Sequence, residues 1–243
     1  MYHTLKTKEV AMMGLFSALV CVATIILKVD IPQTRGYFNV GDSMVFLTAL
    51  LLGPRVGGLA GGLGSMLADV ILGAPWYAPG TFVIKGIEGF VAGKISKRRQ
   101  PLKDEAVAWK LVVVSCGIFV AMVLYFLGST YYSAEWQFSP LNMFVMSFEI
   151  TAFIWLAISV LVAALFAFAA FKLDLNFGWP LLSCMAGGFF MVLGYFVYEY
   201  SVLGLGLLAA YEIPFNLGQV IVGSLIALPL YRALSKREHL STN

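Results

Sequence analysis

A lysine and a glutamate lie three residues apart in a part of the sequence that is otherwise apolar. The stretch 82–90, FVIKGIEGF, places Lys85 and Glu88 one helical turn apart, so the two side chains can form an ion pair on one helix face. A charge at the centre of a membrane-spanning helix costs about 2.5–3.5 kcal/mol on insertion scales, so such groups normally pair or line a polar cavity. The spacing therefore predicts either a polar binding cavity or a structural ion pair that joins two helices.

Four more carboxylic acids lie within apolar segments or at their edges: Asp69, Glu149, Glu199 and Glu212. Asp69 is expected at the outer end of its helix, where it can approach the Lys85–Glu88 pair. Acid–base catalysis by a buried carboxylate has no support beyond burial, and the sequence contains no GxxxxGK[ST], HExxH or GxSxG motif. We therefore predict no catalytic residue, no enzyme activity and no ATP hydrolysis by this chain.

Aromatic and amide side chains are predicted at a similar depth. Asn216 and Gln219 lie three apart and can face one cavity, while Trp76 and Tyr77 occur in a proline-rich and glycine-rich outer loop. Aromatic walls with a few hydrogen-bonding groups are typical of a site for a small, flat, polar molecule. The candidate substrate-binding residues are Asn39, Asp42, Asp69, Trp76, Tyr77, Lys85, Glu88, Tyr195, Glu199, Asn216 and Gln219.

Two loops complete this candidate site. Asn39 and Asp42 are assigned to a first outer loop, 30–42, that acts as a lid, and Trp76 and Tyr77 are expected to close a second loop over the ligand. Lys85 is expected to orient polar or charged groups of the ligand together with neighbouring carboxylates. No metal site is expected, because the two histidines are near the termini and the three cysteines have no CxxC spacing.

The composition determines the class of protein. Of the 243 residues, 60% are hydrophobic and 12% are charged, against about 25% charged in a typical soluble domain. The apolar residues form long blocks, which predict an all-α integral membrane protein. Eight spans are expected, at 9–28, 43–54, 56–72, 80–95, 110–129, 142–171, 180–203 and 213–233.

The basic residues predict the orientation of this bundle. With both termini in the cytoplasm, all but three of the 16 lysines and arginines fall on the cytoplasmic side. The exceptions are Lys28 and Arg35 outside and Lys85 within the membrane. The net charge of +3 thus reflects orientation in a lipid bilayer and gives no reason to expect nucleic acid as a partner.

Small residues recur at helical spacing in two segments. Gly53, Gly57, Gly61 and Ser65 are four residues apart, which allows close helix packing within the chain or against a partner subunit. In the first helix, Ala11, Gly14 and Ala18 form a similar stripe, for which packing and partner contact are both open.

Six segments in order resemble one family. They are AMMGLFSAL, FNVGD, GPRVGGLAGGLGSMLADVI, GTFVIKGIEGFVAGKI, MVLGYFVYEY and EIPFNLGQVIVGSLIALPLYRAL. Together they resemble the substrate-binding membrane subunits (S components) of energy-coupling factor (ECF) vitamin transporters, in the riboflavin-type branch. The resemblance covers 1–100 and 180–235 and implies a six-helix core within one transmembrane domain, 1–243. The segment 101–179 is then expected to be an inserted helix pair.

The resemblance implies a high-affinity vitamin-binding subunit in the plasma membrane of a prokaryote. Its partners would be a transmembrane coupling protein, contacted by Ala11, Gly14 and Ala18, and two ATPase subunits that alone use ATP. No cofactor of its own is implied. Several flavin-binding relatives carry a lysine where Gln219 stands here, so riboflavin, a hydroxymethylpyrimidine (thiamine precursor) and a pyridoxine-like ring are all considered.

Two other functions remain open on the residues. One is an autonomous proton-coupled secondary transporter that uses Asp69, Glu88 or Glu199 as proton carriers. The other is a membrane scaffold or metabolic enzyme in which the buried charges are purely structural.

Overall fold

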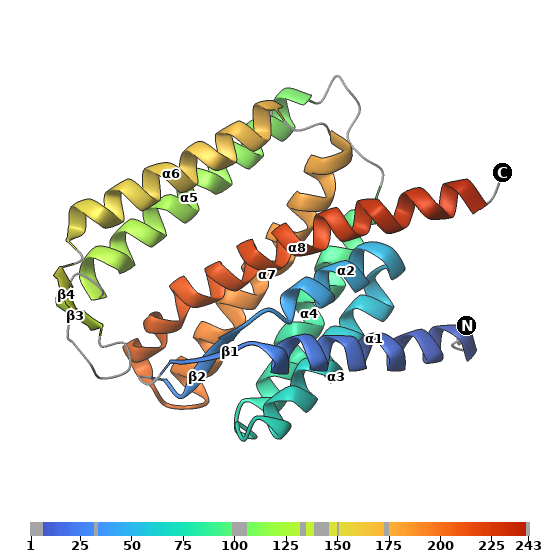
Figure 1. Cartoon of the computed structure of the whole chain (residues 1–243), viewed down its shortest axis with the longest axis horizontal. Coiled ribbons are helices and arrows are strands. Elements are labelled where there is room, and N and C mark those ends of the chain that lie inside the picture. The colour runs from blue at the N-terminus through green and yellow to red at the C-terminus, as the bar shows by residue number, and fades with distance from the viewer. Residues whose placement is uncertain are drawn as a thin grey trace. The chain divides into compact units, whose positions relative to one another are not determined.

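The computed structural model contains a helix at each of the eight predicted positions. It describes residues 7–31, 34–98, 106–131, 135–138, 146–149, 151–172 and 175–241. The helices of this part of the chain are α1 (Thr7–Ile26), α2 (Asp42–Leu52), α3 (Pro54–Ile71), α4 (Ala78–Ser96), α5 (Ala106–Tyr131), α6 (Ala152–Lys172), α7 (Leu175–Ser201) and α8 (Glu212–Ser241). A short 3-10 helix, Gly206–Tyr211, precedes α8. The prediction of an all-α membrane protein is confirmed (Figure 1).

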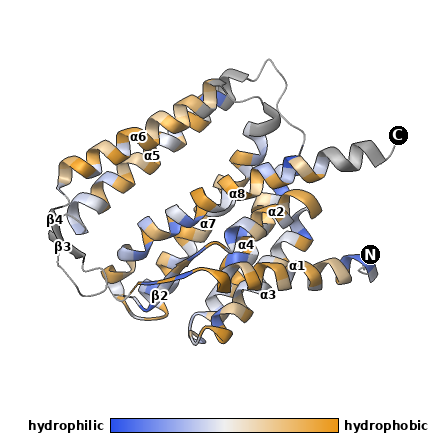
Figure 2. Cartoon of the chain, viewed as in Figure 1, coloured by the Kyte–Doolittle hydropathy of each residue, from blue (hydrophilic) through white to orange (hydrophobic). Residues whose placement is uncertain are grey.

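Apolar side chains cover the outside of these helices as well as their contacts. Within the described residues, four helical segments are long and apolar enough to cross a membrane on their own: Thr7–Ile26, Val113–Tyr131, Gly178–Ser201 and Gly206–Ser235. Large side chains such as Leu15, Phe126 and Leu225 are more than half exposed, which lipid tolerates and water does not. Figure 2 shows hydrophobic residues along most of the length of these helices. That the remaining helices also cross the membrane, and that both termini lie in the cytoplasm, stay predictions.

The chain forms two compact units. Residues 1–99 and 179–243 make up unit 1, and residues 100–178 make up unit 2. Unit 1 contains α1 to α4, most of α7, and α8, and unit 2 contains α5 and α6.

Glycines bring the helices of unit 1 into close contact. α3 packs against α1, α2 and α4. At Gly57, an added Cβ would lie 2.7 Å from the α-carbon of Ala49 in α2 and 3.0 Å from the carbonyl oxygen of Gly89 in α4. Such close backbone approach is what small residues allow in membrane helices. The glycine stripe of α3 thus serves packing within the chain.

A β-hairpin joins α1 to α2, where the sequence predicts an irregular outer loop at 30–42. Strands β1 (Lys28–Ile31) and β2 (Gly36–Asn39) pair antiparallel. Arg35 turns the chain with a φ of 60°, in the left-handed region, and its amide donates to the Ile31 carbonyl oxygen at 3.0 Å. The prediction of a loop missed this hairpin because glycine and charged residues interrupt its short strands.

A second hairpin joins α5 to α6 within unit 2. Strands β3 (Glu135–Phe138) and β4 (Met146–Glu149) pair antiparallel. The expected span 142–171 is therefore wrong at its start, because the described helix begins only at Ala152. The alternation of apolar and polar residues in MSFE and EWQF is a strand signal that overall apolarity concealed.

Candidate substrate-binding site

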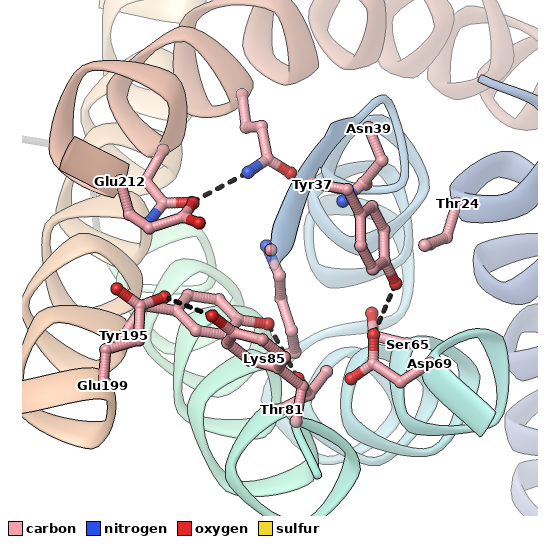
Figure 3. Close-up of a pocket in the computed structure, with 14 residues that line it drawn as sticks. Thr24, Tyr37, Asn39, Ser65, Asp69, Thr81, Lys85, Tyr195, Glu199 and Glu212 are labelled. Atoms are coloured by element: carbon pink, nitrogen blue, oxygen red, sulfur yellow. Dashed lines mark hydrogen bonds between the residues drawn. The ribbon is translucent and has the colours of Figure 1, made fainter. Parts of the chain in front are cut away.

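Unit 1 contains a polar cavity at the end where α1, α3 and α7 finish and α2, α4 and α8 begin, beside the β1–β2 hairpin. The space among its lining atoms, counted together with the part that is open to solvent, is about 410 Å³. The lining residues are Thr24, Gly36, Tyr37, Asn39, Ser65, Asp69, Tyr77, Thr81, Lys85, Tyr195, Glu199, Glu212, Asn216 and Gln219. Figure 3 shows their side chains converging from five helices and the hairpin.

Helical spacing explains why these residues share a cavity. Side chains three or four residues apart lie on one face of a helix. Ser65 and Asp69 are four apart in α3, and the same spacing joins the lining residues of α4 and of α7. In α8, the lining positions 212, 216 and 219 follow the same face. Each wall is therefore a polar stripe on a helix whose other faces are apolar.

Lys85 is the centre of a buried three-residue ion cluster. Its Nζ donates to Oδ1 of Asp42 and lies 3.0 Å from Oε2 of Glu88. The predicted Lys85–Glu88 pair is thus confirmed, and all three side chains are 3% exposed or less. Asp42 is not in a lid: it is the first residue of α2, fully buried beneath the cavity, since the chain turns into the helix one residue before it.

Tyr37 of the hairpin reaches the opposite wall. Its hydroxyl donates a hydrogen bond to Oδ1 of Asp69, the interaction that Figure 3 marks between β2 and α3. Burial, and then the charge of Asp69, raise the pKa of the Tyr37 phenol well above its ordinary range. The phenol therefore stays protonated and remains a donor at physiological pH.

A second polar cluster lies where α7 ends and α8 begins. Thr34 donates to Oε1 of Glu212. The hydroxyl oxygen of Tyr77 lies 3.2 Å from the Thr34 carbonyl oxygen and 3.4 Å from Oε1 of Glu199. Burial, and then the charge of Glu199, raise the Tyr77 pKa well above its ordinary range. Tyr77 thus joins the hairpin turn to α7.

The remaining polar side chains orient one another. Nε2 of Gln219 donates to Oδ1 of Asn216 at 2.8 Å, and the Thr81 and Tyr195 hydroxyl oxygens are 3.0 Å apart. Asn39 accepts from the Gly41 amide at 2.8 Å and so fixes the entry into α2. These contacts hold the walls in place and leave further acceptors free.

Most predicted site residues lie at this cavity. Eight of the eleven line it: Asn39, Asp69, Tyr77, Lys85, Tyr195, Glu199, Asn216 and Gln219. Asp42 and Glu88 lie behind Lys85. Trp76 is 45% exposed and does not line the cavity; its carbonyl oxygen accepts from the Tyr198 hydroxyl at 2.7 Å. Trp76 thus lies on the exposed side of the loop between α3 and α4, while its neighbour Tyr77 is buried.

Sequence reasoning did not select six lining residues: Thr24, Gly36, Tyr37, Ser65, Thr81 and Glu212. The helical spacing from selected residues would have found Ser65, Thr81 and Glu212. Tyr37 and Gly36 depend on the hairpin, which was not predicted. The side chain of Glu149 lies outside the described residues.

The small-residue stripe of α1 lies on the surface of unit 1. Ala11, Gly14 and Ala18 are all exposed, and an added Cβ at Gly14 would meet nothing within 4 Å. The buried face of α1 contains other residues, among them Val20 and Thr24. Within the described part of unit 1, this stripe packs against no other helix at Gly14.

Comparison with known proteins gives a relative and a family. A protein of Pyrococcus woesei, described as an uncharacterized protein in the gap 3′ region, is 54% identical over 78 residues, which are 32% of this chain and 52% of that protein. The chain therefore spans about half the length of this curated relative. The model of one family matches residues 4–140, more than half of the chain and beyond the predicted boundary at residue 101. The chain belongs to the family of S components of ECF-type riboflavin transporters.

Proposed function

We propose that this protein is the substrate-binding subunit of an ECF-type importer for a small water-soluble vitamin or vitamin precursor. Family membership supports a transport subunit, and the cavity in unit 1 supports a binding role. One observation carries the proposal: ten polar or ionisable side chains, together with three tyrosine rings, surround one pocket in an otherwise apolar bundle. Polar groups in lipid are costly unless they pair or bind something.

A structural role alone does not account for this arrangement. The Lys85 cluster is internally paired and could serve stability. The carboxylates of Glu199 and Glu212, however, lie on other helices and have no cation within salt-bridge distance among the described residues. A purely structural site would be expected to neutralise them.

Ligand-release mass spectrometry on detergent-purified protein from cells grown in rich medium tests this function. We expect a stoichiometric compound of vitamin size from the wild type, and its loss from Asn216→Ala. Ser224→Ala is the matched control, because Ser224 is buried in the same helix, donates to the Val220 carbonyl oxygen and does not line the cavity. A wild type that releases no compound, and whose melting temperature no vitamin raises, would contradict the proposal.

The exposed stripe Ala11, Gly14 and Ala18 is proposed to contact the coupling protein. We expect Gly14→Leu to abolish co-purification with that protein and to leave the melting temperature and ligand content unchanged, since the added side chain has open space. Leu15→Phe is the control, because Leu15 is exposed beside the stripe but is already large. Normal assembly of Gly14→Leu would argue against this surface.

A further inference from the structure

The residues that line the cavity carry an imbalance of charge. Its acidic members are Asp69, Glu199 and Glu212, and its only cation among the described lining residues is Lys85. These three acidic residues are each 3% exposed or less. Ionised carboxylates removed from water are unfavourable unless a cation or several donors compensate them.

Lys85 does not supply that compensation. Its ammonium group donates to Asp42 and lies 3.0 Å from Glu88, so two carboxylates already surround one positive charge. With these groups ionised, the cluster adds a net negative charge to the site. Among the described residues, the carboxylates of Glu199 and Glu212 receive only hydroxyl donors, from Tyr77 and Thr34.

The three fully buried lining atoms that lack a hydrogen-bond partner in the described structure are all acceptors. Oε2 of Glu199, Oε1 of Gln219 and Oδ2 of Asp69 are buried and accept no hydrogen bond in the described structure. All three belong to residues that line the cavity. No lining residue has an unpartnered buried donor among the described side chains. A ligand that pairs with these three atoms must therefore bring donors, and Gln219 requires them independently of the acidic residues.

Aromatic rings complete a setting that favours positive charge. Tyr77 and Tyr195 have ring centroids 6.5 Å apart and planes inclined by 56°. Both rings line the cavity. The faces of such rings attract cations, and the attraction strengthens where water is excluded. Their area also suits a flat heterocycle.

From these observations we infer that the ligand is a cationic heteroaromatic molecule whose protonated amine, amidine or ring nitrogen donates to Glu199, Glu212 and Gln219. The inference rests on the proposed function and narrows its substrate class. It favours a cationic ring that bears an amine or another N–H donor over an uncharged flavin. The carboxylates on α7 and α8 supply the charge, and the tyrosines cover the ring.

Binding assays with matched probes test this substrate class. The full-length protein in lipid nanodiscs is titrated at pH 7 with pyridoxamine and pyridoxine, which share a ring and differ by an ammonium in place of a hydroxyl. Thiamine, a permanent cation, and riboflavin, uncharged, extend the comparison. The variants are Glu199→Gln and Glu212→Gln. Asp30→Asn is the control, since its carboxylate is 69% exposed and outside the cavity.

We expect at least one cationic probe to bind about tenfold or more tightly than its uncharged counterpart. Each glutamine variant should lose about tenfold of that affinity, while Asp30→Asn stays within about twofold. Tighter binding of pyridoxine or riboflavin, unaffected by both glutamine variants, would overturn the cationic class and leave the binding function standing. If none of the four probes binds, the inference of a cationic heteroaromatic ligand is rejected. Release of no compound from the purified wild type would remove the function itself.

Discussion

The buried lysine and its two carboxylates show how charge can be tolerated in an apolar bundle. Asp42 begins α2, whereas Lys85 and Glu88 share one face of α4, so the cluster joins two helices. Its charges are stabilised mainly by one another, because water does not reach the side chains. Removal of one charged side chain should therefore destabilise the protein more than neutralisation of all three.

Lys85→Met is expected to destabilise the protein strongly, by about 3–5 kcal/mol, because Asp42 and Glu88 would then remain buried without a cation. The triple variant with Asp42→Asn and Glu88→Gln should recover part of this loss. Thermal unfolding in detergent measures both. Equal melting temperatures for Lys85→Met and the wild type would contradict a buried ion cluster. If the triple variant recovers no stability, the loss in Lys85→Met does not come from the two carboxylates left without a cation.

Close contact between α3 and α4 involves glycines of both helices, Gly57 and Gly89 among them. An added Cβ at Gly89 would lie 2.7 Å from the carbonyl carbon of Gly57, which is backbone and cannot yield cheaply. At Gly86, in the same helix, the nearest atom is the Gly58 carbonyl oxygen at 3.6 Å, an ordinary contact. Gly89 and Gly86 are therefore both glycines of α4, but only Gly86 has room for an added methyl group.

Gly89→Ala is expected to lower stability by about 1–3 kcal/mol through overpacking. Gly86→Ala should be neutral or stabilising, because alanine favours the helix and restricts the unfolded chain. Melting temperatures of the two variants, measured side by side, test the contact. Equal effects at both positions would show that α3 and α4 do not approach as described.

The sequence was informative about helices and less so about what joins them. Long apolar runs predict all eight helices because burial in lipid selects for them. The three-residue spacing of Lys85 and Glu88 predicts their pair, since a helix alone determines it. Asp42 is 43 positions from Lys85, and only the folded hairpin and α2 bring them together. For the same reason Tyr37 was not selected for the site.

The division of the chain into two units suggests that the binding cavity does not depend on unit 2. All fourteen lining residues belong to unit 1. The chain leaves this unit after α4 and returns at Trp179, whose indole nitrogen donates to the Ile95 carbonyl oxygen of α4 at 3.1 Å. A short connection could therefore join the two ends.

Replacement of residues 101–176 by a flexible Gly/Ser linker of about twelve residues is expected to leave unit 1 folded and ligand-binding. A linker of this length has a root-mean-square span of roughly 17–21 Å, ample for neighbouring chain ends. Monodispersity in detergent and ligand content are the measurements. A shortened protein that aggregates, or one that folds without ligand, would show that unit 2 is needed for the site.

Energy dependence of uptake tests the central claim most directly. Proteoliposomes containing this protein, with or without a coupling protein and two ATPase subunits, would be supplied with the compound released from the purified protein. We predict uptake only with the complete module and ATP, and none when the ATPases cannot hydrolyse ATP. Uptake by this protein alone, driven by a proton gradient and lost in Glu199→Gln, would contradict the account and establish an autonomous transporter instead.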